Sequence, residues 1–261
     1  MFRIKPLKQA EISVPLGAVA MLGDMRLLAS GPVYVWLIES EDQKIVVDAG
    51  VSEPKNGLVH GFPCKDGGEK GLRNALSTVG LSPEDVETLI ITHLHFDHVA
   101  NAKLFQNARI FVQKREWESA MNPPMHYRDI YEKELFSPLE EMDLCLVNGD
   151  FELMEGIRLV LLPGHTKGLQ GVLVEAQSGR YLISGDHFYS YLNVHPPKTP
   201  IEFEDETGQK VSVGSNLPFH PPGLHVDLSE WFESCFKALS LVRRSRILPG
   251  HEPSIEGQEF T

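Results

Sequence analysis

The segment Thr92-His93-Leu94-His95-Phe96-Asp97-His98 follows an apolar run at residues 88–91 and decides how the whole chain is interpreted. Alternate side chains of an extended chain share a face, so His93 and His95 can reach one metal ion. A turn directly after them would deliver Asp97 and His98 to a second ion. The alternative is a polar strand end whose histidines are merely hydrogen-bonded. So dense a group of imidazoles with a carboxylate favours a layout for two metal ions.

Three later segments place further residues of the metal-binding type directly after apolar runs. They are Gly164-His165-Thr166 after residues 157–162, Gly185-Asp186 after residues 181–183, and Pro249-Gly250-His251 after residues 247–248. Each candidate ligand therefore stands at the end of a predicted strand. Taken in this order, the four segments resemble the metal-binding motifs of the metallo-β-lactamase superfamily, and the resemblance spans residues 33–251.

The resemblance implies an α/β protein with the αββα sandwich of that superfamily, in which two mixed sheets pack face to face under outer helices. It also implies two metal sites, with His93, His95 and His165 at one and Asp97, His98 and His251 at the other. Asp186 would bridge the two ions. A ligand set without thiolate suits Zn²⁺, which we expect, and is also compatible with Mn²⁺, Fe²⁺ or Co²⁺.

The expected reaction is hydrolysis by a hydroxide that bridges the two ions and attacks a carbonyl carbon. The same ions would stabilise the departing alkoxide, while Asp97 or Asp186 handles the proton. A small lactone or similar carbonyl ester fits this division of roles. We therefore predict a metal-dependent, lactonase-like hydrolase.

Within the superfamily, the sequence His-Leu-His-Phe-Asp-His resembles the form found in N-acyl homoserine lactonase-like enzymes, which carry a tyrosine three residues past the bridging aspartate. Tyr189 occupies that position. We expect Tyr189 to donate a hydrogen bond to the substrate carbonyl, and Phe96 and Tyr189 to contact the substrate. The alternative for Tyr189 is a packed ring in an aromatic cluster. Lys167 and Leu169 depart from the Pro and His more usual in that group, which leaves the exact substrate open.

Other hydrolases of the superfamily are competing interpretations. A glyoxalase II-like thioesterase would share the metal site, but that family appends a basic helical region, and only ten residues follow His251 here. Enzymes that open cyclic amides such as β-lactams would be expected to have Cys in place of Asp186 and an export signal. A phosphodiesterase that acts on nucleic acid is disfavoured by the charge of the chain.

Composition restricts the partners and the location of the protein. The chain has 261 residues, 42% of them hydrophobic, which is enough for one large domain over residues 1–261. The formal net charge of −12 argues against nucleic acid, because phosphate contacts need clustered Lys and Arg. Three cysteines without metal-finger spacing and no export signal or long apolar run predict a cytoplasmic protein without membrane spans. A homodimer remains open.

The order of short apolar runs and helical periods predicts alternating strands and helices. Strands are expected as a meander at residues 18–22, 33–39 and 44–48, then at 88–92, 109–113, 157–163, 171–176 and 180–184. Helices are expected before Gly80, from residue 114, and from about 228 to 243 with Asp227 and Glu230 as a capping box. Asp48 ends the meander, where it could support the metal site or simply cap a turn.

Three irregular segments have no sustained period. We expect residues 51–68 to form a loop, with His60 and Cys64 as ordinary loop residues. Residues 121–138, which include His126, Tyr127 and Tyr131, and residues 187–226 are expected to border a pocket or to pack as surface loops. His195, His220 and His225 lack partners at metal spacing and are predicted not to be ligands. His187 adjoins Asp186 but is expected to point away from it if the chain is extended there.

Overall fold

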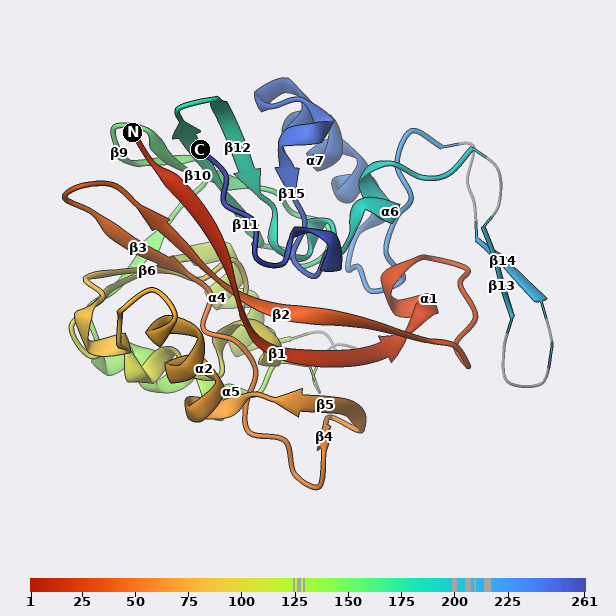
Figure 1. Ribbon diagram of the computed structural model, residues 1–261, viewed down its shortest axis with the longest axis horizontal. Coiled ribbons are helices and arrows are strands. Elements are labelled where there is room, and N and C mark those ends of the chain that lie inside the picture. Colours follow the sequence, from red (N-terminus) through yellow and green to blue (C-terminus); the bar gives the residue numbers. More distant parts are fainter. Residues whose placement is uncertain are drawn as a thin grey trace.

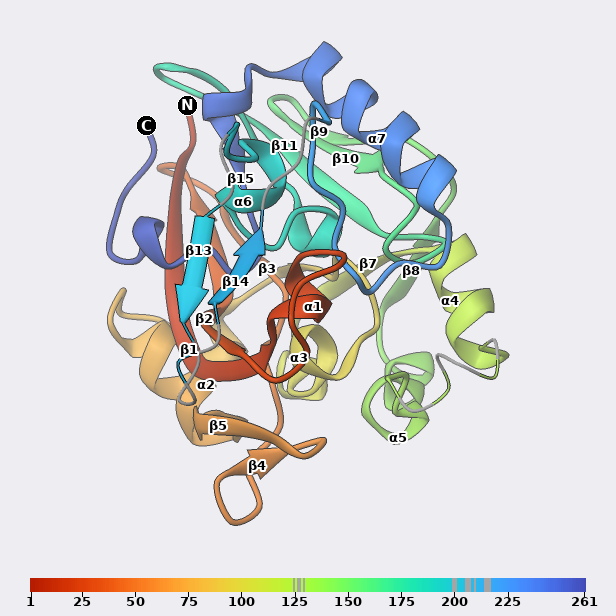
Figure 2. The same ribbon diagram turned by 90° about the vertical axis from the view of Figure 1, so that its right-hand side faces the viewer.

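The most apolar strands of the chain are buried on both faces, because they build two sheets that face each other and carry helices on their outer sides (Figures 1 and 2). The computed structural model describes residues 1–123, 125, 128, 130–198, 201–204, 208, 210–213 and 217–261, with the backbone alone for residues 201, 203 and 211–213. The predicted αββα sandwich of two mixed sheets is confirmed.

The larger sheet contains eight strands among the described residues, in the order β4-β5-β1-β2-β3-β6-β7-β8. A long antiparallel hairpin joins β1 to β2, and β3, β6, β7 and β8 run parallel to one another. The bounds are β1 Arg3–Pro15, β2 Leu28–Glu39, β3 Lys44–Val47, β4 Leu58–Val59, β5 Phe62–Asp66, β6 Thr88–Ile90, β7 Arg109–Gln113 and β8 Leu144–Val147.

The smaller sheet has the order β15-β12-β11-β10-β9, antiparallel except for the parallel pair of β12 and β15. Its bounds are β9 Phe151–Met154, β10 Ile157–Leu161, β11 Gln170–Ala176, β12 Gly179–Ile183 and β15 Ile247–Leu248. A separate hairpin of β13 (Ile201–Glu204) and β14 (Lys210–Val213) projects beside this body, at the right of Figure 1.

Side chains of the two sheets alternate between an inner and an outer core. In β2, Tyr34 and Trp36 point toward the smaller sheet, whereas Val35 and Leu37 point toward the helices, so the strand is a continuous apolar run. The helices are α1 Leu16–Val19, α2 Gly68–Ser77, α3 Phe96–Val99, α4 Lys114–Met121, α5 Lys133–Phe136, α6 Tyr191–Val194 and α7 Leu228–Leu241. Helices α2, α4 and α5 cover the larger sheet, and α7 covers the smaller one.

The closing helix α7 follows its predicted pattern. Asp227 caps it by accepting a hydrogen bond from the amide of Glu230 at 2.9 Å, and Trp231 and Cys235 are fully buried. The side chain of Glu230 pairs with Arg115 at 2.6 Å, so the described contacts show one half of the capping box.

Three sequence predictions about elements were wrong. Residues 18–22 are not a strand; α1 and a turn occupy them, and the first strand of the meander is β1, which is paired along its whole length with β2. Residues 51–68 are not simply a loop, because β4 and β5 form a short hairpin that adds to the edge of β1. Residues 187–226 contain α6 and the hairpin of β13 and β14.

The candidate ligands lie on loops at the carboxyl ends of strands from both sheets. His93 follows β6 of the larger sheet, while His165, Asp186 and His251 follow β10, β12 and β15 of the smaller one. All four strands direct their loops to one edge of the sandwich, which is where function is commonly placed on a rigid scaffold. No helix in the part of the chain that the structure describes is long and apolar enough to cross a membrane.

Candidate metal centre

Three histidines form the first group of convergent side chains. Nε2 of His93 and Nε2 of His165 each lie 3.1 Å from Nδ1 of His95. All three residues are almost fully buried. His93 and His95 come from the segment after β6, and His165 comes from the loop after β10, so the group joins the two sheets.

A second group contains Asp97, His98, Asp186 and His251, which are also buried. Asp97 and His98 lie in the short helix α3, which begins directly after His95, so the predicted turn does carry them away from the first group. Nε2 of His98 lies 3.8 Å from Oδ1 of Asp97, and Nε2 of His251 lies 3.7 Å from Oδ2 of Asp97.

Asp186 lies between the two groups, and its carboxylate oxygens face different ones. Oδ2 lies 3.7 Å from Nε2 of His165 and 4.0 Å from Nε2 of His93. Oδ1 lies 3.2 Å from Nε2 of His98 and 3.0 Å from Nε2 of His251. A carboxylate in this position can contact one cation with each oxygen.

Hydrogen bonds at the far side of each ring fix the orientation of three histidines. Nδ1 of His165 donates to the carbonyl of Leu224 at 2.9 Å, and Nδ1 of His251 donates to the carbonyl of Pro32 at 2.8 Å. Because a carbonyl accepts only, these Nδ1 atoms carry the proton and the Nε2 lone pairs face inward. Nδ1 of His98 is held in the same way by a carboxylate.

That carboxylate belongs to Asp48, which the sequence left open between a role at the site and a turn cap. Its Oδ2 lies 2.8 Å from Nδ1 of His98, and its Oδ1 accepts from the amide of Thr92 at 2.7 Å. Asp48 has φ 63°, a left-handed backbone that aspartate tolerates better than most residues. The described contacts therefore place Asp48 behind the candidate ligands, where such partners orient metal-bound histidines.

Burial determines the direction of the pKa shifts in the first group, whereas neighbouring charges outweigh burial at His98 and Asp186 in the second. Burial lowers the pKa of His93, His95 and His165, so that these rings are neutral near pH 7 and present lone pairs. Burial also acts on His98, but the carboxylates of Asp186, Asp97 and Asp48 raise its pKa well above the usual range. Burial would raise the pKa of Asp186, yet His251 and His98 hold it well below normal.

The donor set fits divalent cations. Nε2 of His98, Nε2 of His251 and Oδ1 of Asp186 are buried without a hydrogen-bond partner. Buried polar atoms rarely remain unsatisfied, and an ion that they coordinate is one accepted explanation. Imidazole nitrogens and carboxylate oxygens are ligands for Zn²⁺ and for related transition metals. The two groups could therefore hold one ion each, with Asp186 in contact with both.

Glu116 organises the loops of the centre, and sequence reasoning missed it. Its Oε1 accepts from the amide of Leu94 at 3.0 Å and from the hydroxyl of Tyr131 at 3.1 Å, and its Oε2 accepts from Thr166 at 2.6 Å and from the amide of Gly168 at 3.1 Å. Burial raises the pKa of Glu116, and these four bonds oppose that shift. One carboxylate thus connects the two loops that carry His95 and His165.

Phe96 and Tyr189, the two predicted substrate contacts, both border the centre. Phe96 lines a cavity that reaches His95 and Asp186. The ring of Tyr189 packs edge-on against His165 and stacks on His251, with centroids 5.5 Å apart in each case. Tyr189 therefore stands between candidate ligands of the two groups, and it lines the same cavity as Phe96. Lys167 is exposed, whereas Leu169 is buried in the outer core.

None of the other described histidines belongs to either group, although His60 lines the cavity that reaches His95 and Asp186. His187 is buried against Trp231, with its Nε2 3.5 Å from Sγ of Cys235, and burial lowers its pKa to about 3. His60 contacts Glu132, and His220 and His225 bond backbone carbonyls. His126 and Tyr127 fall outside the described residues. Ile130 and Leu224, from the two irregular segments, line the cavity of Phe96.

Comparison with known proteins agrees with this geometry. A model of the Metallo-beta-lactamase superfamily matches residues 29–251. N-acyl homoserine lactonase AiiA of Bacillus thuringiensis subsp. kurstaki is 34% identical over 185 residues, which cover 67% of this chain and 68% of the relative. An N-acyl homoserine lactone hydrolase solved with N-hexanoyl-L-homoserine at its catalytic metal centre is 26% identical, with a TM-score of 0.74 over 96% of this chain and 92% of the other. A probable metal-dependent hydrolase from Staphylococcus aureus has a TM-score of 0.78 at 18% identity, covering 96% of this chain and 89% of its own, and shows likeness of fold alone.

Proposed function

Since this chain belongs to the metallo-β-lactamase superfamily, we propose that it is a dinuclear metal hydrolase that opens a lactone or a similar ester. The family assignment made from the sequence is confirmed by these matches. The predicted enzyme class, a lactonase-like metal-dependent hydrolase of ester bonds, is confirmed by the same relatives. We further propose that two ions are bound, which residues bind each of them, and how the reaction proceeds.

His93, His95 and His165 would bind one ion, and Asp97, His98 and His251 would bind the other. Asp186 would bridge them, and the observation that supports this role is the division of its two oxygens between the groups. Zn²⁺ is the ion we expect from the ligand types, which also accept Mn²⁺, Fe²⁺ and Co²⁺.

The ions would supply the nucleophile, a hydroxide shared between them with a pKa lowered toward about 7, and positive charge for the developing oxyanion. The chain contributes the proton path and the orientation of the substrate. Asp97 lines the cavity of Phe96 and a second cavity that reaches His251, so its carboxylate is placed to carry a proton toward the leaving alkoxide. Asp186 is 1% exposed and engaged by both groups, which suits it less to proton transfer.

Tyr189 is the proposed hydrogen-bond donor to the substrate carbonyl oxygen. Its ring is fixed between His165 and His251, so the phenol is oriented before the substrate arrives. A donor that is already in place stabilises developing negative charge without a cost of reorganisation. Phe96 would give the substrate an apolar surface beside the same carbonyl.

The test is a substrate screen with purified protein whose metal content has been measured. The panel contains N-hexanoyl homoserine lactone, unsubstituted γ-butyrolactone, a glutathione thioester, a β-lactam and a phosphodiester. We expect the lactones to be hydrolysed with the highest kcat/KM, a chelator to abolish the activity, and Zn²⁺ to restore it. Faster turnover of the thioester, the β-lactam or the phosphodiester by the same loaded protein would replace the proposal with the corresponding alternative.

A further inference from the structure

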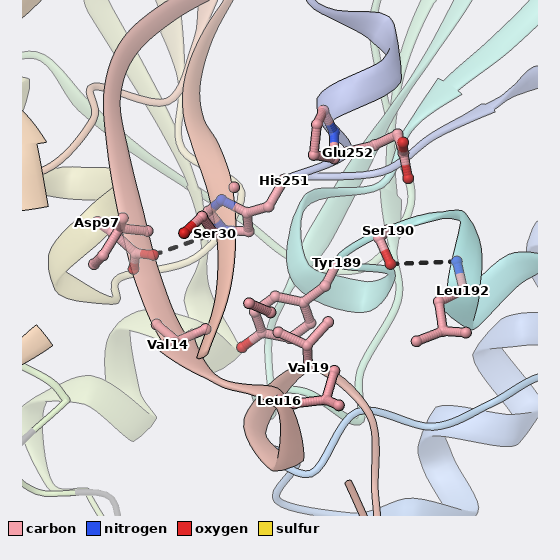
Figure 3. Close-up of a pocket in the computed structure, with 14 residues that line it drawn as sticks. Val14, Leu16, Val19, Ser30, Asp97, Tyr189, Ser190, Leu192, His251 and Glu252 are labelled. Carbon is pink, nitrogen blue, oxygen red and sulfur yellow. Dashed lines mark hydrogen bonds and ion pairs between the residues drawn. The ribbon is translucent and has the colours of Figure 1, made fainter. Parts of the chain in front are cut away.

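Two cavities in the described part of the chain meet at the candidate metal centre. The first, of about 330 Å³, is enclosed mainly by the hairpin of β1 and β2 and by α1 and reaches Asp97 and His251 (Figure 3). We call it the hairpin chamber; its apolar walls are Ile12, Leu16, Val19, Ala29, Leu192 and Pro253. The second, of about 260 Å³, reaches His95 and Asp186. We call it the loop chamber; its walls include Ala18, Phe62, Phe96, Ile130 and Leu224.

Val14, Asp97 and Tyr189 line both chambers and mark the place where they meet. Helix α1 separates them beyond that point. Leu16 and Val19 are three residues apart and therefore share one face of α1, and both line the hairpin chamber. Ala18 lines the loop chamber instead. A molecule whose reacting group lies beside Asp97 and Tyr189 can thus extend in two separate directions.

The hairpin chamber suits an uncharged, apolar group. There is no lysine or arginine among the described residues that line it. Its serines are already engaged, because Ser30 bonds Ser13 at 2.6 Å and Oγ of Ser190 accepts from the amide of Leu192 at 3.2 Å. Glu252 is also held, since its carboxylate accepts from the backbone amides of residues 191 and 254. Because these polar side chains already have hydrogen-bond partners, burial of apolar surface is the main source of affinity that the chamber offers to a ligand.

An ester has two arms that leave the scissile bond in different directions, the acyl side and the alcohol side. We propose that each chamber binds one arm, so that the preferred substrate is a lactone or ester with apolar groups on both sides of the ester bond. This inference rests on the proposed function. Water adds its oxygen to the carbonyl carbon, the acyl carbon–oxygen bond breaks, and a proton reaches the alkoxide, which gives a hydroxy acid.

The proposal separates this enzyme from one that acts only on N-acyl homoserine lactones. Such lactones carry their chain on the carbon next to the carbonyl, on the acyl side, and the ring carbon bonded to the ring oxygen bears hydrogens alone. They would fill one chamber and leave the other empty. A lactone with an alkyl group on each of these two carbons would fill both.

The experiment compares four substrates on the metal-loaded protein: γ-butyrolactone, which is achiral, its racemic α-hexyl and γ-hexyl derivatives, and the derivative with both chains as a mixture of its stereoisomers. Burial of one methylene contributes roughly a fourfold gain in binding, so each chain is expected to raise kcat/KM by at least about tenfold over the unsubstituted ring. The doubly substituted lactone is expected to be the best of the four. No gain from a chain on one of the two sides would overturn the inference.

Two alanines supply a matched pair of variants. Ala29→Leu fills the hairpin chamber and Ala18→Leu fills the loop chamber with the same added side-chain volume. We expect each variant to lower the kcat/KM gain from one of the two chains by about tenfold, and the two variants to affect opposite sides. If both variants penalise the same chain, the chambers do not divide the substrate.

A variant that does not fold is replaced by its counterpart that enlarges the same chamber. Leu192→Ala and Phe62→Ala are expected to lengthen the preferred chain on opposite sides, and lengthening on the same side would contradict the proposal. If the loaded wild-type protein hydrolyses none of the lactones, the proposed function itself is wrong. If it hydrolyses them without regard to the chains, only the two-chamber inference is wrong.

Discussion

Oδ2 of Asp48 lies 2.8 Å from Nδ1 of His98, and Oδ1 of the same carboxylate accepts the amide hydrogen of Thr92 at 2.7 Å. One side chain therefore fixes the first residue of the histidine-rich segment and its last. The bond to Asp48 holds a proton on the outer nitrogen of the His98 ring, Nδ1, and directs Nε2 toward Asp186, 3.2 Å away. Asp48 thus sets the orientation of a candidate ligand without lining either chamber.

Asp48→Asn is expected to weaken the binding of one metal ion by roughly 10- to 100-fold, the usual cost of losing a partner behind a ligand. The second ion should be affected much less, because Asp48 contacts the ring of His98 alone among the candidate ligands whose contacts are described. Titration with a competing chelator measures both affinities. Asp143→Asn, a change of an exposed carboxylate, is the control. Affinities within twofold of the wild type would show that Asp48 only caps the turn.

Metal analysis is expected to give about two ions per chain at saturation. Seven candidate ligands in two groups are more than one four- or five-coordinate ion can use. Elemental analysis after dialysis against buffered Zn²⁺ makes the measurement. A saturating value of one ion per chain would contradict the dinuclear proposal.

His98→Ala and Asp186→Ala are expected to differ in how many ions they lose. His98 contributes to one group, so its removal should release one ion and leave the other bound. Asp186 faces both groups, so its removal should weaken both sites. The same elemental analysis, repeated at several free Zn²⁺ concentrations, distinguishes the two patterns. Loss of a single ion in both variants would argue against the bridge.

Tyr189→Phe is expected to lower kcat for the best lactone by roughly 10-fold or more, at unchanged metal content. A lost oxyanion donor typically costs about 10²–10³ in kcat, but here the ions would share the stabilisation. Because phenylalanine preserves the ring between His165 and His251, the change isolates the hydroxyl. Steady-state kinetics beside metal analysis decide the point. Full activity in this variant would leave Tyr189 as a packed ring.

Glu116→Ala is expected to lower the free energy of unfolding by about 3 kcal/mol or more, because four donors lose their acceptor and a buried unsatisfied group costs about 1–3 kcal/mol. Urea unfolding of the metal-free proteins gives the measurement. Glu118→Ala is the matched control on the same helix, since Glu118 is exposed and pairs loosely with Lys114 at 3.8 Å. Equal stability of the two variants would remove the organising role given to Glu116.

The positions of the candidate ligands are predictable because they follow short apolar runs, whose length is typical of buried strands. The change in direction between His95 and Asp97 is predictable for the same reason. The extended segment ends at His95, and α3 then turns the following side chains away from the first group. Such local signals are strong where a short apolar run and a polar residue adjoin. They indicate which residues gather at the sheet edge, and the structure brings all seven together in two groups.

Features that depend on contacts between distant segments could not be predicted. Glu116 lies in a helix of polar sequence, and its burial arises only when the loops around Leu94 and Gly168 fold onto it. Strand β1 contains Pro6 and several charged residues, and its extended form depends on pairing with β2 along its whole length. The two chambers likewise depend on where α1 packs against the loops that carry Tyr189 and Leu224.

The two ends of the hairpin of β1 and β2 have different roles. The end that begins at Arg3 packs Ile4 and Trp36 into the core between the sheets. The opposite end, next to α1, forms walls of both chambers. Residues 12–30 include none of the seven candidate ligands, so substitutions there can alter the shape offered to a substrate without replacing a reacting group, whereas Gly31 packs against His251. Related enzymes can therefore evolve different substrate preferences through single substitutions in this hairpin, while the reaction itself is retained.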